Sequence, residues 1–122
     1  MKHLALGALL ALAAAAAAHE ISPDEAMARI GDPAVRAAFD VTAVERKADL
    51  PRLLVVRVGP GWAAVYPERR RDAAETWYHL WRDAVPGGIV AIVDRDEQSL
   101  VNFDAAGLAT MHDPAPRPTA PD

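Results

Sequence analysis

The sequence contains no cysteine. This absence excludes a disulfide framework, a lipid-bearing cysteine, a thiolate nucleophile and a zinc site built on cysteine ligands. The chain also lacks the nucleophile elbow, the zinc-protease helix motif, the Walker phosphate loop and the dinucleotide-binding glycine pattern. The sequence therefore favours a role other than catalysis, and a small hydrolase is the third of three functional alternatives.

Long apolar runs are also scarce, and the one from Leu4 to Ala18 is shorter than the roughly 20 residues of a membrane-spanning helix. Lys2 precedes this run, and Ala16 and Ala18 supply the small residues of a signal-peptidase site. We therefore predict a signal peptide over residues 1–18 and a periplasmic or secreted location. A retained anchor is the alternative, and we expect no stable membrane insertion after cleavage.

The remaining sequence is long enough for one domain with a single hydrophobic core. We expect this compact domain over residues 19–113. In residues 114–122, a proline recurs at every second or third position and prevents a helix or a sheet ladder. This segment is predicted to be a disordered, proline-rich tail.

Basic side chains are the minority, with thirteen Lys and Arg against seventeen Asp and Glu and a net charge of −4. A nucleic-acid-binding surface needs an excess of basic side chains to neutralise phosphates. Nucleic acid is therefore not an expected partner.

Capping signals predict a helical segment at the start of the domain. The sequence S-P-D-E at residues 22–25 is a capping box with proline at the first helical position, and it predicts a short helix through Ile30. Asp32 and Pro33 repeat the start signal, so a second short helix or turn is expected over 33–39.

Apolar periodicity predicts the later elements. A long amphipathic helix is expected from Pro67 to about Val85, where a Pro-Gly-Gly sequence stops it. The expected strands are 41–47, 52–58, 89–93 and 99–103, with 108–111 as a candidate edge strand. We predict an α+β fold, in which a small antiparallel or mixed sheet of about four strands packs one face against the long helix.

Three consecutive arginines, Arg69, Arg70 and Arg71, occupy the start of the long helix, where the helix macrodipole favours anions. This placement costs helix stability unless an anionic group lies nearby. The simpler explanation is internal pairing with Asp72, Glu75 or the acidic N-terminal segment. The alternative is an anionic partner that binds at this end of the helix.

All three tryptophans lie between residues 62 and 81. Trp77 and Trp81 fall on the apolar stripe of the long helix, whereas His79 falls on its solvent face beside Glu75. Trp62 follows a Gly-Pro-Gly loop, so it either closes the core or stands out as a partner-binding anchor.

Two groups of residues suggest metal binding. Asp94, Asp96 and Glu97 lack the glycine and glutamate of an EF-hand at the required spacing, so a solvated hairpin turn is the better interpretation. His19 becomes the first residue after the predicted cleavage and can chelate Cu(II) with its amino group and ring nitrogen. His112 is a second copper ligand only if the two ends of the domain meet.

Taken together, these patterns favour an exported, non-enzymatic binding or protein-interaction module. Its expected partner is an unknown protein or an anionic partner, and Trp62 and residues 69–71 are the candidate contacts. Periplasmic copper binding through His19 is the alternative, and otherwise no cofactor is expected.

Overall fold

The computed structural model describes residues 21–103, 107 and 109–111. In this part of the chain, five strands form one mixed sheet in the order β1-β2-β3-β4-β5. The strands are β1 (Val41–Lys47), β2 (Leu50–Val58), β3 (Ile89–Val93), β4 (Ser99–Phe103) and β5 (Ala109–Met111). Strands β2 and β3 run parallel, and every other neighbouring pair is antiparallel.

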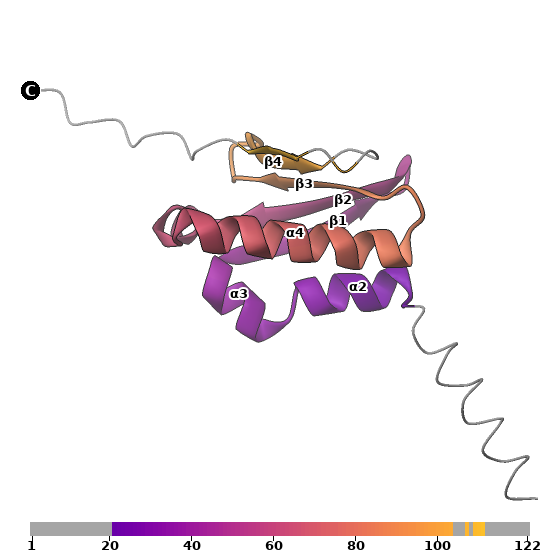
Figure 1. Ribbon diagram of the computed structural model, residues 1–122, viewed down its shortest axis with the longest axis horizontal. Helices are drawn as coiled ribbons and strands as arrows, with labels where there is room; N and C mark the ends of the chain where they lie inside the picture. The colour runs from indigo at the N-terminus through magenta and orange to yellow at the C-terminus, as the bar shows by residue number, and fades with distance from the viewer. Residues whose placement is uncertain (1–20, 104–106, 108, 112–122) are drawn as a thin grey trace, which may run out of the picture.

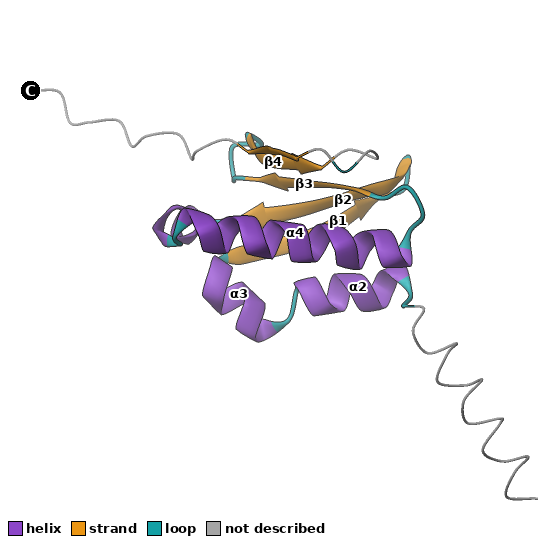
Figure 2. Cartoon of the chain, viewed as in Figure 1, coloured by secondary structure: helices purple, strands orange, loops and turns teal. Residues whose placement is uncertain are grey.

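The helices α2 (Pro23–Ile30), α3 (Pro33–Phe39) and α4 (Pro67–Ala84) pack on one side of the sheet (Figure 1). Helix α4 connects the parallel strands β2 and β3, after a short 3-10 helix, η1 (Pro60–Ala64). Figure 2 shows the resulting two layers, with the helices on one side of the strands. None of the helices in the described ranges is long and apolar enough to span a membrane.

The predicted α+β class is confirmed, and the number of strands is corrected. We predicted about four strands, and the described sheet has five. The fifth strand is the short segment Ala109–Met111, which pairs antiparallel with β4. This strand lies within residues 108–111, the candidate edge strand of the sequence, which the count of about four did not include.

Side-chain caps fix the two short helices. The Ser22 hydroxyl accepts a hydrogen bond from the Glu25 backbone N–H at 3.1 Å, and an Asp32 carboxylate oxygen accepts one from the Ala34 N–H at 3.0 Å. These bonds satisfy backbone donors that the first turn of a helix leaves free. The start signals in the sequence thus correctly predicted both helices.

The core lies between α4 and the sheet. Leu54, Val56 and Val58 alternate along β2 and point into it, together with Val90 and Ile92 of β3. From α4 the core receives residues that share one face of the helix; these are Ala73, Ala74, Trp77, Tyr78 and Trp81. The opposite face carries Glu68, Glu75, His79 and Arg82, all exposed as predicted.

Two aromatic contacts hold α4 in register. The Trp81 Nε1–H donates to the Arg52 carbonyl oxygen of β2 at 2.9 Å, and the Trp81 side chain is fully buried. The Tyr78 ring stacks on Phe103 of β4 with a centroid distance of 4.5 Å. The C-terminal half of α4 is therefore held beside the start of β2 and the end of β4.

Candidate functional site

The N-terminal end of α4 combines exposed and buried groups of unusual chemistry. Tyr66 occupies the N-cap position, makes no side-chain capping bond and is 74% exposed. Its carbonyl oxygen accepts the Arg70 backbone N–H at 3.0 Å. The first turn of the helix therefore has no side-chain acceptor for its free N–H groups, which makes this end favourable for a negative charge.

Arg70 is buried, with 8% of its surface exposed. Its Nη1 atom is enclosed by protein and has no hydrogen-bond partner. Arg70 precedes Trp77 by two helical turns, which places both side chains on the same, inward face of α4. Buried guanidinium groups normally have ion-pair or hydrogen-bond partners, so this one requires an explanation.

The other two arginines of the cluster are exposed. Internal pairing, the simpler explanation of the cluster, is not found, because within the described ranges no ion pair includes Arg69, Arg70 or Arg71. The Arg69 guanidinium instead lies over the Phe39 ring, 5.6 Å from its centroid. At this end of α4, where Glu68 is also in the first turn, no acidic side chain of the described part forms an ion pair with these arginines.

A shallow groove of about 320 Å³ lies between α3 and α4 beside Arg69. Its apolar lining comes from Val35 and Phe39 of α3 and from Ala73 and Trp77 of α4, while Arg69, Asp72 and Thr76 supply the polar lining. Phe39 meets Trp77 edge to face at a centroid distance of 5.6 Å. The groove is therefore an apolar depression with one cation and one carboxylate at its polar side.

Trp62 belongs to the core. It is 2% exposed, and its ring lies 6.0 Å from Trp77 and 6.3 Å from Phe39, measured between centroids. Of the two placements that the sequence allowed, the structure has the internal one. An outward Trp62 would have supported a partner-binding surface, so support for that function has to come from other residues.

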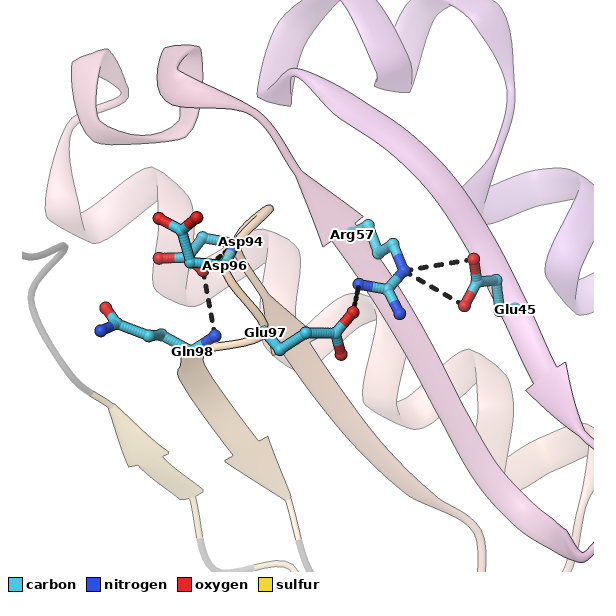
Figure 3. Close-up of polar contacts among 6 residues, drawn as sticks. All are labelled: Glu45, Arg57, Asp94, Asp96, Glu97 and Gln98. Carbon is cyan, nitrogen blue, oxygen red and sulfur yellow. Dashed lines mark hydrogen bonds and ion pairs between the residues drawn. The ribbon is translucent and has the colours of Figure 1, made fainter.

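The acidic segment between β3 and β4 forms a hairpin turn, as expected (Figure 3). The Asp94 carboxylate accepts the backbone N–H groups of Asp96 and Gln98, at 2.9 Å and 3.0 Å. Among the described residues, no three His, Cys, Asp or Glu side chains are placed to hold a metal ion. The carboxylate of Asp94 thus serves the turn itself.

Glu97 and Glu45 share one arginine on the sheet face away from the helices (Figure 3). The Arg57 Nε–H donates to Glu45 at 3.1 Å, and its Nη1 donates to Glu97. The hydrogen bond with Arg57 lowers the pKa of Glu97, and the bonds with Glu97 and then Glu45 raise the pKa of Arg57. This charge network joins β1, β2 and the β3–β4 turn.

The histidines contribute little to the described site. His79 is exposed on the outer face of α4, and its ring lies 5.5 Å from the Tyr78 ring between centroids. The two residues of the copper alternative, His19 and His112, lie outside the described residues. The copper hypothesis therefore stays a prediction.

Sequence reasoning missed three features of this site: the exposure of Tyr66, the contact of Phe39 with Arg69, and the burial of Arg70. For Arg70 a signal was present, since a residue seven positions before Trp77 lies on the same helical stripe. Tyr66 also lies three and four positions before Arg69 and Arg70, which places it on their side of the helix. The position of Phe39 depends on tertiary packing and had no such signal.

No protein-family model matches this chain, and comparisons with curated proteins and with solved structures also found no match. The function of the protein is therefore inferred from the chemistry of the site.

Proposed function

We propose that this protein is an exported, non-enzymatic binding module that takes an anionic partner at the N-terminal end of α4. The observation that supports this function most strongly is the buried Arg70 guanidinium, whose Nη1 atom has no partner. The export part of the proposal is supported by the signal-peptide features of residues 1–18.

The state of Arg70 costs stability. A buried donor without an acceptor loses about 1–3 kcal/mol of hydration that nothing replaces, and a charged group loses more. Folding alone gives no benefit from this arrangement, because an apolar side chain of similar length would fill the same space. Because Nη1 is enclosed, a ligand oxygen reaches it only when the surrounding side chains move apart. The charge-assisted hydrogen bond that then forms offsets the cost.

The surroundings of Arg70 add attraction for negative charge. The uncapped first turn of α4 presents backbone N–H groups, and Arg69 and Arg71 are exposed on either side. Both features favour an anion at the same end of the helix, and the two exposed cations also accelerate its approach. Exposed Tyr66 provides a flat amphipathic surface beside them, of the kind enriched in binding interfaces.

The test uses Arg70→Met, which removes the charge and leaves an unbranched apolar side chain, with Arg95→Met in the β3–β4 turn as an exposed control. Each protein is melted in sodium phosphate and in sodium chloride of equal ionic strength. We expect phosphate to raise the melting temperature of the original protein and of Arg95→Met, and to have a much smaller effect on Arg70→Met. In chloride, Arg70→Met is expected to be at least as stable as the original.

Two results would contradict the proposal. One is an equal response of all three proteins to phosphate, which would show that Arg70 contacts no anion. The other is a strong destabilisation by Arg70→Met in chloride, which would show that the guanidinium already has an internal role.

A further inference from the structure

We propose that the groove between α3 and α4 binds an extended partner segment in which an apolar side chain stands next to a carboxylate. The apolar side chain enters the groove, and Arg69 takes the carboxylate. This inference rests on the proposed function and adds to it the kind of anionic partner that the surface fits.

The position of the Arg69 guanidinium suits a carboxylate of the partner segment. Its guanidinium lies 5.6 Å from the centroid of the Phe39 ring. Contact over a ring uses the flat face of a guanidinium and leaves its in-plane N–H groups free, in the fork that matches a carboxylate. Because none of the described acidic side chains pairs with Arg69, this fork is held in place with no internal acceptor.

The lining of the groove suits the apolar side chain of the proposed partner segment. The apolar lining comes from Val35, Phe39, Ala73 and Trp77. Trp77 is only 4% exposed, so the core holds its side chain in place. The groove volume of about 320 Å³ is of the size that accommodates a large side chain. A rigid apolar depression of this kind loses little conformational entropy when a side chain enters it.

Asp72 sets the direction of the bound segment. It lies three residues after Arg69 on α4 and also lines the groove, but the two form no ion pair in the described structure. A partner carboxylate is therefore attracted toward Arg69 and repelled near Asp72, whereas a backbone N–H or a cation is favoured near Asp72. The complementary segment carries its carboxylate toward the N-terminal end of α4.

The experiment titrates the isotopically labelled protein with three capped tetrapeptides and follows amide and indole signals by NMR. The first peptide has the sequence Gly-Leu-Asp-Gly; in the second Asn replaces Asp, and in the third Ala replaces Leu. We expect the first peptide to shift signals of α3, of residues 69–77 and of the Trp77 indole. The other two peptides are expected to bind roughly tenfold more weakly, because each loses one of the two contacts.

Matched variants locate the contact. Thr76→Trp fills the groove from an exposed lining position, and Glu75→Trp adds the same bulk at an exposed position that does not line the groove. Arg69→Gln removes the proposed carboxylate contact, with Arg95→Gln, at an exposed position in the β3–β4 turn, as its control. We expect Thr76→Trp to abolish the binding of the Leu-Asp peptide, Arg69→Gln to weaken it roughly tenfold, and both controls to retain it.

The outcomes separate this inference from the proposed function. If the peptide fails to bind, binds equally with Asn, or binds equally to Thr76→Trp, the groove assignment is wrong. If phosphate still stabilises the protein through Arg70 in that case, the proposed function stands without it. Loss of both responses would overturn both proposals.

Discussion

Arg57 of β2 donates a hydrogen bond from Nη1 to the Glu97 carboxylate in the β3–β4 turn, although the two residues are forty positions apart in the sequence. The bond holds the turn against the middle of the sheet. It also favours the ionised form of Glu97 and lowers the pKa of this carboxyl below its usual value of 4.5.

This pKa shift predicts a pH dependence of stability. A carboxyl whose pKa is lower in the folded state stabilises the fold above its unfolded-state pKa, and the contribution disappears as the pH falls through the folded-state value. We therefore expect Glu97→Gln to be less stable than the original protein near pH 7. The difference should shrink below pH 4.5 and vanish at more acidic pH.

Denaturant melts of both proteins across this pH range check the prediction. Glu68→Gln is the control, because Glu68 is exposed and forms no ion pair in the described structure. A difference between Glu97→Gln and the original that stays constant down to strongly acidic pH would show that the ion pair is not its cause.

The orientation of α4 predicts that substitutions at positions 77 and 79 differ greatly in their effect on stability. Trp77 is 4% exposed and contacts both Phe39 and Trp62, so Trp77→Ala should lower the free energy of unfolding by about 3–5 kcal/mol. His79 is exposed on the other side of the helix, and His79→Ala should change it by less than about 0.5 kcal/mol. Equilibrium unfolding in urea measures both, and the reverse ranking would contradict the orientation of α4.

Local signals in the sequence were sufficient for most of the elements. The Ser22 and Asp32 caps predicted the starts of α2 and α3, and the apolar run of residues 52–58 predicted most of β2. The parallel pairing of Leu53 with Ile89 was not predictable in the same way, because a crossover through α4 sets that register and no neighbouring residues encode it.

The candidate site was only partly predictable for a related reason. The cluster of residues 69–71 is visible in the sequence as a conflict with the helix dipole, and within the described residues no ion pair forms with any of the three arginines. The groove depends on how Phe39 of α3 packs against Trp77 of α4, and the angle between two helices is a tertiary property.

Asp40 connects the end of α3 to the loop after β2, and its replacement provides the last prediction. Its backbone is left-handed, with φ at 55°, its carbonyl oxygen accepts the Gly59 N–H at 2.8 Å, and its carboxylate accepts the Gly61 N–H at 2.7 Å. Asp40→Ala keeps the backbone bond but loses the side-chain bond and places alanine in an unfavourable conformation, so we expect a loss of about 1–3 kcal/mol. Asp40→Asn retains an acceptor oxygen and tolerates the left-handed conformation, and it should restore most of that stability. Urea unfolding of the two variants distinguishes the causes: if Asp40→Asn is as unstable as Asp40→Ala, the negative charge rather than the hydrogen bond to Gly61 stabilises this loop.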